Sequence, residues 1–479
     1  MIRIGILSAL LCMFALNGPA FGGSYPIVDS GQNGCFDNQS QTKCPKPGDL
    51  FNGQDSQYKG NVARYRDNGD GTVSDLVTGL MWVKARGYKL SWQSAINGAQ
   101  VCRVGGYDDW RAPSIKELYS LMDFNGWVQG KAQDSVAFID TRYFDFAWGN
   151  TRAGARIIDC QDWSSTLYKG TTMGGNRTAF GVNFADGRIK GYPTMDRGTR
   201  HDKYIRYVRG NPDYGRNDFV DNGNGTISDK GTGLVWQKSD DGKTRNWEQA
   251  LSYCENLTAA GRDDWRLPSA KELQSIVDYS RSPSATNSAA IDPIFGIMEM
   301  ESYFWSATTH LDGPKPSHAA YVAFGRAMGY FAPPRSNSKT FMDVHGAGAQ
   351  RSDPKSGDPS RYSQGHGPQG DDIRINNYVR CVSGGGVEYY EPSNDRIPEW
   401  KGVAGGDPNQ PMGRNSNTSK GQGRRGGAPQ EAFDACNSKS SGDRCKVQTP
   451  RGTIAGICQD TPEGTVCVPK NGRGRRSRQ

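Results

Sequence analysis

Apolar residues recur at intervals of three and four positions along 118–122 and again along 273–277. This spacing places them on one face of a helix. Ahead of the first stretch, Ser114 and Glu117 stand three positions apart, and the same pair of residue types precedes the second stretch. These residues form a capping box, in which each side chain accepts a hydrogen bond from the other residue's amide. The pattern predicts a short buried helix after each serine, and alanines at helical spacing from Ala95 predict another helix before it.

Short β-prone runs flank two glycine-rich turns. Asn-Gly-Asp-Gly at 68–71 and Asn-Gly-Asn-Gly at 222–225 contain residues that tolerate the positive φ angles of hairpin turns. A calcium loop of the EF-hand type needs an oxygen ligand at its first position, where these stretches have Arg66 and Val220. We therefore expect β-hairpins without calcium.

The helix and hairpin signals belong to an internal repeat, which fixes the domain plan before any single element is assigned. The matching stretches are 64–84 with 218–238, 105–124 with 260–279, Trp-Ser-Ser-Thr from Trp163 with Trp-Ser-Ala-Thr from Trp305, and 203–210 with 377–384. We predict one domain at 57–210 and a second at 215–384. The second domain carries an insertion between Pro333 and Asp371.

The chain begins with an export signal. Arg3 precedes an apolar run along 4–16, and the small residues Ala20 and Gly22 follow, which is the arrangement of a signal peptide at 1–22. No later stretch reaches the roughly eighteen apolar residues of a membrane-spanning helix, so we expect no transmembrane segment. The other predicted segments are a cysteine-containing leader at 23–56, a flexible linker at 385–432, a four-cysteine module at 433–469 and a basic tail at 470–479.

Beyond Cys12 in the signal, an even number of cysteines remains, which in an exported protein favours disulfides. The two repeats lack cysteines in pairs. The aligned positions are Cys254 with Ala99, Cys381 with Tyr207, Cys102 with Leu257 and Cys160 with Ser302. Because bonded partners should be lost together, we predict the disulfides Cys102–Cys160 and Cys254–Cys381.

The other cysteines lie outside the repeats. Cys35 and Cys44 are close enough in sequence for a local pair in the leader. Four more belong to the C-terminal module: Cys436, Cys445, Cys458 and Cys467. Their spacing is wider than the two to four residues usual between paired zinc ligands, so we predict two disulfides. All three connectivities remain open.

The formal net charge of +8 is concentrated near the C-terminus. Residues 402–479 contain 13 Lys and Arg against 6 Asp and Glu, so +7 lies there. This distribution predicts that polyanions bind mainly to the tail. The candidate contacts are Arg424, Arg425, Arg473, Arg475, Arg476 and Arg478.

Candidate catalytic residues are scarce. The chain has five histidines, four of them in the second repeat, and lacks the GxSxG, HExxH and P-loop motifs. Asp-Asp-Trp-Arg at 108–111 is interpreted as structural, with the carboxylates capping amides and pairing with the arginine and the tryptophan in the core. A less favoured alternative is a metal-dependent enzyme using the insertion. Its candidate ligands are Asp343, His345, His366, Asp371 and Asp372. We predict no enzymatic activity, no metal and no cofactor.

Four sequence motifs resemble the family named for the C-terminal domain of the Legionella collagen-like protein. They are DGTVSDLVTGLMW from Asp70, GGYDDWRAPSIKEL from Gly105, Trp-Ser-Ser-Thr, and a closing Tyr-Val-Arg. The resemblance occurs twice and covers about two thirds of the chain. It implies an α+β fold of two tandem C-type lectin-like domains, each a mixed twisted sheet with two helices, beside a small disulfide-rich C-terminal module. Family members are exported bacterial proteins, and the namesake is an adhesin for sulfated glycans. The first copy departs at Ala112, where the second has Leu267.

Binding is the favoured class of function. Along 181–192 and 320–330, Arg188, Lys190 and Arg326 stand beside aromatic residues, which suggests a face for anionic or stacked sugars. An ordinary solvated strand edge is the alternative. Two modules in tandem would bind a repeating polymer with avidity. We expect a surface, periplasmic or secreted protein, adhesin-like, with a glycan or acidic polymer as partner and no specific nucleic acid. The competing hypothesis is a structural or assembly component of the envelope.

Overall fold

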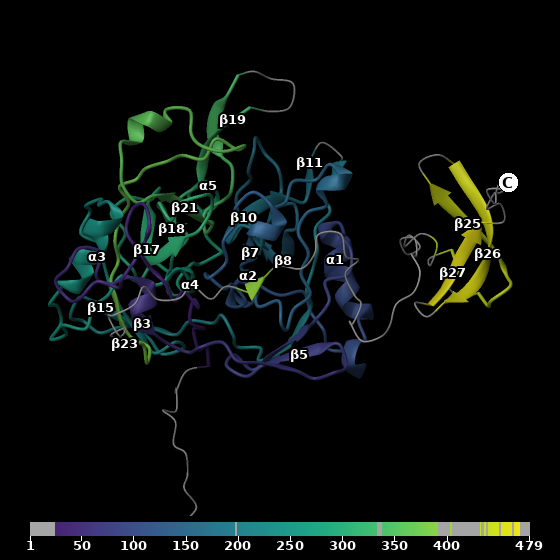
Figure 1. Ribbon diagram of the computed structural model, residues 1–479, viewed down its shortest axis with the longest axis horizontal. Helices are drawn as coiled ribbons and strands as arrows, with labels where there is room; N and C mark the ends of the chain where they lie inside the picture. Colours follow the sequence, from purple (N-terminus) through teal and green to yellow (C-terminus); the bar gives the residue numbers. More distant parts are fainter. Residues whose placement is uncertain are drawn as a thin grey trace, which may run out of the picture. The chain divides into compact units, whose positions relative to one another are not determined.

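The computed structural model describes residues 24–196, 199–332, 338–390, 403–404, 432, 435–436, 439–449, 452–461 and 464–469. These residues belong to two compact units that divide between Gly413 and Arg414 (Figure 1). The first unit contains the leader and both repeats, and the second contains the four-cysteine module. The predicted signal peptide, most of the predicted linker and the basic tail lie outside the described residues.

Repeat 1 combines helices α1 (Trp92–Gly98) and α2 (Ile115–Ser120) with two antiparallel sheets, ordered β13-β6-β5-β4 and β10-β9-β8. The strands of the first are β4 (Tyr65–Asp67), β5 (Thr72–Asp75), β6 (Leu80–Val83) and β13 (Val208–Gly210). Those of the second are β8 (Asp162–Leu167), β9 (Thr178–Asn183) and β10 (Arg188–Pro193). A further small sheet pairs β11 (Met195–Asp196) with β12 (Thr199–Arg200).

Repeat 2 follows the same plan with helices α3 (Trp247–Glu255), α4 (Ala270–Ser275) and α5 (Pro283–Thr286). One sheet contains β14 (Phe219–Asp221), β15 (Thr226–Asp229), β16 (Leu234–Gln237) and β22 (Val382–Gly384). The other contains β17 (Tyr303–His310), β18 (His318–Ala323) and β21 (Gln350–Pro354). Small antiparallel sheets with few helices make the fold α+β. Within the described ranges, each helix is too short or too polar to span a bilayer.

Short 3-10 helices lie in the connections. They are η2 (Ala99–Val101), η3 (Val104–Gly106), η4 (Ala132–Asp134), η5 (Thr151–Ala153) and η6 (Pro359–Tyr362).

The local elements predicted from the sequence are confirmed. Ser114 and Ser269 are the N-caps of α2 and α4, and both capping boxes are complete. Both glycine-rich turns close antiparallel hairpins, β4–β5 and β14–β15. In each hairpin the turn asparagine, Asn68 or Asn222, donates its backbone N–H to the threonine carbonyl four residues later, at 3.0 Å.

The Asp-Asp-Trp-Arg stretch is structural, with partners different from those expected. Its tryptophan is buried in both repeats. Arg111 bonds to the capping-box glutamate Glu117 at 2.6 Å rather than to the adjacent aspartates. Asp109 instead pairs with Arg209 on β13 at 2.6 Å. The stretch therefore ties the start of α2 to the closing strand.

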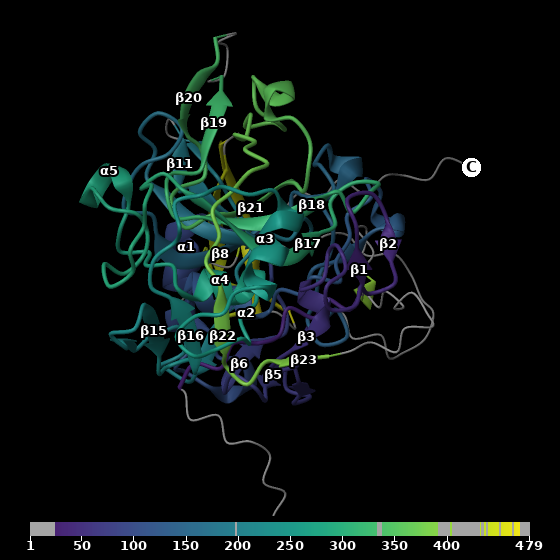
Figure 2. The ribbon, with the colours of Figure 1, turned by 90° about the vertical axis from the view of Figure 1, so that its left-hand side faces the viewer.

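The insertion in repeat 2 begins before Pro333 and is divided by β21, with extra residues on both sides of that strand. It includes a hairpin of β19 (Met328–Phe331) and β20 (Thr340–Asp343), which projects from the unit in Figures 1 and 2. The chain then returns through β21, which pairs with β18 as β10 pairs with β9. Arg326 precedes the hairpin, whereas Arg188 begins β10, the strand that corresponds to β21.

The leader contacts both repeats and covers part of repeat 2. It forms β1 (Cys35–Phe36), β2 (Gln41–Thr42) and most of η1 (Asp55–Gln57), and the chain continues into β3 (Tyr58–Lys59), which lies within the range predicted for repeat 1. Strand β3 pairs with β23 (Glu388–Tyr389), at the start of the predicted linker. Another linker strand, β24 (Val403–Ala404), pairs with β7 (Val136–Ala137). At these described positions the linker is part of the fold.

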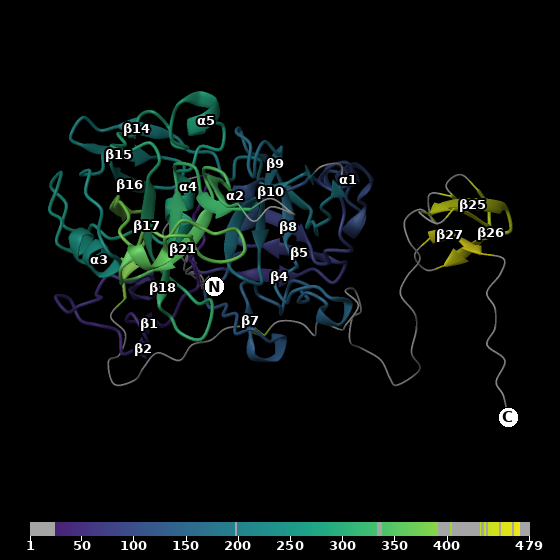
Figure 3. The ribbon, with the colours of Figure 1, turned by 90° about the horizontal axis from the view of Figure 1, so that it is seen from above.

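The two repeats share one hydrophobic core. Buried residues of both, including Phe180 of β9, Leu273 of α4 and Phe304 of β17, belong to a single cluster. Helices α2 and α4 contact each other at its centre (Figure 3). Burial of apolar surface stabilises a fold by roughly 25 cal/mol per Å². The repeats therefore form one body rather than two independent domains.

Reciprocal lysine contacts accompany this core. Lys116 of α2 donates through Nζ to the carbonyl of Ser275, the last residue of α4, at 2.7 Å. Lys271 of α4 donates to the carbonyl of Ser120, the last residue of α2, at 2.9 Å. Carbonyls at a helix end have no partner within the helix. Each repeat therefore satisfies the helix end of the other, as in an isologous interface.

One predicted disulfide of the repeats is confirmed and the other is wrong. Cys254–Cys381 joins α3 to the segment before β22, whereas Cys102 and Cys160 are free thiols. In repeat 1 the counterpart of the Cys254–Cys381 link is a hydrogen bond from Tyr207 Oη to the Ala95 carbonyl at 2.9 Å. This hydrogen bond links the helix to the closing strand of repeat 1, as the disulfide does in repeat 2. The loss of both members of that disulfide from repeat 1 therefore did not require Cys102 and Cys160 to form a replacement bond.

The leader pair Cys35–Cys44 is confirmed. The C-terminal module is a three-stranded antiparallel sheet of β25 (Arg444–Thr449), β26 (Gly452–Thr461) and β27 (Gly464–Pro469). Its disulfides are Cys436–Cys458 and Cys445–Cys467. These two bonds select one of the three connectivities left open by the sequence.

We expect thiol labelling to distinguish the pairing found from the pairing predicted. In denaturant without reductant, an alkylating reagent should label Cys102 and Cys160, because only free thiols react, and leave the disulfide cysteines unlabelled. Under native conditions Cys160 should react far more slowly, because burial raises its thiol pKa to about 12. Peptide mass spectrometry reads both results. A Cys102–Cys160 linked peptide would contradict the assignment.

Substitution of the inter-repeat lysine should weaken the whole first unit. Lys271→Met leaves the carbonyls of Asp29 and Ser120 without their donor. An unsatisfied buried polar group costs about 1–3 kcal/mol, so the free energy of unfolding in urea should fall by a similar amount. Lys243→Met, at an exposed position, is the charge-matched control. Equal stability of the two variants would show that the contact contributes nothing.

Candidate functional site

Two of the three sequence-predicted ligand residues, Arg188 and Lys190, lie where the two repeats adjoin. Strands β10 and β21 contact each other there, and Gly191 N donates to the His345 carbonyl at 2.7 Å. We call the charged residues at this junction the seam. The seam contains Asp186, Arg188, Lys190, Asp312, His345, Arg351 and Asp371.

Arg188 is committed to partners within the seam. Its Nη2 lies 2.5 Å from Asp312, and its Nη1 lies 3.5 Å from Asp186. Burial by itself would lower the pKa of Arg188, but the Asp312 and Asp186 carboxylates raise it above its ordinary value. Because its side chain is 13% exposed, Arg188 joins the repeats instead of presenting a charged strand face. Contact of Arg188 with a sugar stays a prediction.

Lys190 is similarly enclosed, with a side chain 12% exposed and Asp186 at 4.0 Å. Burial lowers its pKa to about 8, and nearby Arg351 lowers it further. Arg326 is more open, but Glu301 accepts from both its Nε, at 2.7 Å, and its backbone N–H. The three candidate residues therefore do not form one binding face.

The insertion supplies a second charged group. His345 Nε2 lies 2.8 Å from Asp371 Oδ1, and Arg351 bonds to the other carboxylate oxygen. Burial lowers the pKa of His345 to about 4, although Asp371 opposes this change. Burial alone would raise the pKa of Asp371, but Arg351 and His345 hold it well below its ordinary value. The group is thus a neutral imidazole on an ionised, arginine-bound carboxylate.

The other candidate metal ligands are distributed among separate partners. Tyr168 Oη donates to Asp343 at 2.7 Å, and Arg374 Nε donates to Asp372 at 3.0 Å. His366 exchanges backbone hydrogen bonds with Asp371. Within the described ranges, the one group with metal-ligand proximity is Cys436, Cys445 and Cys458, and these cysteines are disulfide-bonded. The geometry does not assemble the insertion residues into a metal centre.

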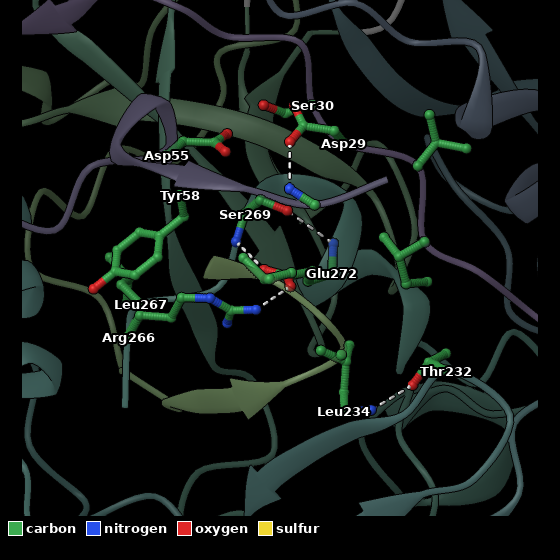
Figure 4. Close-up of a pocket in the computed structure, with 15 residues that line it drawn as sticks. Asp29, Ser30, Asp55, Tyr58, Thr232, Leu234, Arg266, Leu267, Ser269 and Glu272 are labelled. Carbon is green, nitrogen blue, oxygen red and sulfur yellow. Dashed lines mark hydrogen bonds and ion pairs between the residues drawn. The ribbon is translucent and has the colours of Figure 1, made fainter. Parts of the chain in front are cut away.

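A small cavity lies between the leader and repeat 2 (Figure 4). Asp29 and Asp55 lie above it in the view, and Arg266 and Glu272 lie below. Its volume is about 30 Å³, room for roughly two water molecules. Arg266 bonds to Glu272 at 2.6 Å, and its Nη1 is buried without a protein partner. The cavity suits ordered water and is too small for a sugar.

Asp55 is a buried carboxyl group that lines this cavity. Its carboxylate accepts a hydrogen bond from Thr308 Oγ1 on β17. Burial raises its pKa to about 7, and Asp29 adds to the rise, whereas Thr308 opposes it. No sequence signal identified Asp55, because the leader has no periodicity and no counterpart in repeat 1.

The leader makes the two repeats unequal. On β17, Ala307 and Thr308 are buried beside the leader, whereas the equivalent Ser165 of β8 is exposed. Repeat 1 therefore exposes a surface whose equivalent in repeat 2 is covered by the leader. The predicted tail contacts, from Arg424 to Arg478, lie outside the described residues.

Comparison with known proteins gives one match. The family model of the Lcl C-terminal domain matches residues 71–209 and 225–344, which together make up more than half of the chain. No curated protein and no solved structure matches the chain.

We expect Asp55→Asn to change the pH dependence of stability. Between its unfolded pKa of about 4 and its folded pKa of about 7, Asp55 binds a proton only in the folded state. Its contribution is therefore full below pH 4 and is lost as the pH rises through 7. Asparagine does not titrate and has no such loss. Between pH 5 and pH 8, the free energy of unfolding of the variant should therefore rise relative to that of the parent by on the order of 1–3 kcal/mol.

Urea denaturation at several pH values measures this difference. Asp213→Asn, at an exposed position between the repeats, is the control. Parallel pH profiles for parent and Asp55→Asn would refute the assignment of a buried, protonated Asp55.

Proposed function

Because the chain belongs to the Lcl C-terminal domain family, we propose that it is an exported bacterial binding protein of the cell surface, periplasm or medium. In this proposal it contacts glycans or other acidic polymers in the manner of an adhesin. The observation that carries the proposal is the duplicated family domain in a disulfide-bonded chain. Disulfides persist in oxidising compartments, which supports export.

A C-type lectin-like fold is part of the proposal. In its support, each repeat places a short capped helix against antiparallel sheets, and the same motif opens that helix in both copies. Scaffolds of one type host unrelated functions, so the function depends on which surfaces remain open. Repeat 1 offers the more open surface, since the leader covers the corresponding part of repeat 2.

We propose further that the protein has no catalytic activity. The perturbed groups of the seam support this view, because His345 and Asp371 are bonded to each other and Asp371 is also bonded to Arg351. A general base needs a free lone pair directed at substrate. His345 Nδ1 is buried without a described partner, so substrate does not reach it without rearrangement.

Two repeats in one body change the expected form of avidity. Independent modules on a flexible connection would sample many spacings, whereas this first unit holds its repeats at fixed spacing through a shared core. Two fixed sites raise affinity only for polymers whose repeat matches that spacing. We therefore propose selectivity for polymer geometry.

The competing proposal is a structural or assembly component of the envelope without a small ligand. The shared core and the pairing of β3 with β23 favour this proposal, because they make the first unit a rigid body. A glycan array separates the two. Reproducible binding to a defined class of glycan supports the first proposal. An array without any bound glycan, together with envelope proteins that co-purify with the chain, supports the second.

Removal of the C-terminal unit should reduce polyanion binding. Truncation after Gly413 follows the boundary between the two units, keeps the paired strands β23 and β24, and leaves a chain of formal charge near zero. The full chain should elute from heparin at higher salt than the truncated chain. Exposed charges are screened within roughly 8 Å at physiological salt, so retention of the full chain should fall steeply with salt.

The salt concentration at elution is the measurement. Circular dichroism of the truncated chain confirms that the first unit has folded. Elution of both chains at the same salt would assign the polyanion contact to the repeats and refute the role of the tail.

A further inference from the structure

Lys203 of repeat 1 is a buried cation without an anionic partner. It is 7% exposed, and its backbone is fixed by hydrogen bonds with Leu90 in both directions, at 2.8 and 3.0 Å. Within the described residues its Nζ donates no hydrogen bond and forms no ion pair. Lysines are rarely buried unless paired, so this position calls for an explanation.

Two aromatic rings hold the Lys203 ammonium group. Its Nζ lies 4.7 Å from the ring centre of Trp163 and 4.5 Å from that of Tyr192. Such contacts stabilise a cation but leave its three donors unused. The Tyr192 hydroxyl is also buried, and it has no hydrogen-bond partner among the residues that the structure describes. Unused donors of two adjacent side chains therefore occupy one region of repeat 1.

Repeat 2 shows what occupies the equivalent position there. The matched closing segments align Lys203 with Asn377, and the sheet registers align Tyr192 with Asp353. Asp353 Oδ2 accepts from Asn377 Nδ2 at 3.1 Å and from the amides of Arg374 and Ile375. Repeat 2 thus places its own carboxylate beside residue 377, whereas repeat 1 has Tyr192 at the equivalent position.

The surrounding charges leave the region electropositive. Burial lowers the pKa of Lys203 to about 8, and repulsion from Lys89 and Lys190 lowers it further. Asp159 and Asp202 act in the opposite direction, with smaller effect. The Lys89 ammonium group donates to the Asp159 carbonyl at 2.6 Å and lies 5.4 Å from the ring centre of Tyr204. An anion here would relieve the mutual repulsion of the lysines.

We propose that Lys203, with Tyr192, forms a site in repeat 1 for one oxyanion, such as a sulfate or carboxylate group. The oxyanion takes the role that the Asp353 carboxylate has in repeat 2. The site itself does not depend on the tail. Only the source of the anion, a substituent of an extracellular polymer, rests on the function proposed above.

Inorganic sulfate tests the site in the full chain. A ligand of the folded state raises the unfolding temperature, so sodium sulfate should raise it above the value in sodium chloride of equal ionic strength. Lys203→Met keeps the apolar stem beside the rings and removes the charge. Its affinity for sulfate should fall roughly tenfold, because a charge-assisted hydrogen bond is lost.

Lys230→Met is the matched control, since it makes the same change of net charge at an exposed position of repeat 2. It should respond to sulfate as the parent does. Sulfate also stabilises proteins generally, and this effect is common to all three chains. An equal sulfate response in Lys203→Met and parent would overturn the site.

The pH dependence gives a second readout. The sulfate response of the parent should decline from pH 7 to pH 9, as Lys203 and the neighbouring Lys190, with pKa values of about 8, lose their protons. A sulfate response that stays constant across this range would contradict the involvement of these lysines.

The polymer arm separates the site from the proposed function. Heparin and fully desulfated heparin, which keeps its carboxylates, are compared on parent and Lys203→Met. If Lys203→Met weakens binding to heparin but not to desulfated heparin, the anion is sulfate. If it weakens binding to both polymers, the anion is carboxylate. A sulfate-ion response without polymer binding supports the site and rejects the proposed function. Polymer binding that is unaffected by Lys203→Met, with no ion response, rejects the site and leaves binding to the tail.

Discussion

The buried contact between α2 and α4 holds the first unit together. Each helix is short, and neither repeat offers a complete partner for its apolar face, so the two faces bury each other in one core. Lys116 and Lys271 then satisfy the helix-end carbonyls that this packing removes from water. Burial lowers the pKa of both lysines to about 8, a cost that the hydrogen bonds and the shared core offset.

This contact decides which surfaces are available for binding. It brings β10 against β21, where Arg188 and Lys190 pair with carboxylates rather than face solvent. The leader then covers the end of β17 and strengthens the asymmetry between two otherwise similar repeats. A duplicated domain has in this way produced one body whose halves differ in exposure. The open half contains Lys203, and the covered half contains an internal carboxylate, Asp353, at the matching place.

Reasoning from sequence succeeded where a few adjacent residues decide the outcome. The capping boxes at Ser114 and Ser269 depend on side chains three positions apart, and both formed as predicted. It failed where the outcome depends on residues far apart in the chain. The Cys102–Cys160 pair was inferred from alignment, but Tyr207 supplies the helix-to-strand link of repeat 1. Lys203 could have been noticed from its alignment with Asn377, although nothing in the sequence showed that Tyr192 replaces the carboxylate.

The sequence by itself determined the repeat, the family, the capped helices, the hairpin turns and the even set of cysteines, because each follows from local spacing or from self-similarity. Only the tertiary structure decided that the repeats share a core, that the leader contacts both and covers part of repeat 2, and that Arg188 pairs with carboxylates while Ser165 is exposed. The physical reason is that burial and ion pairing depend on which surfaces meet. Two nearly identical repeats that pack face to face, with one leader between them, acquire different environments at equivalent positions.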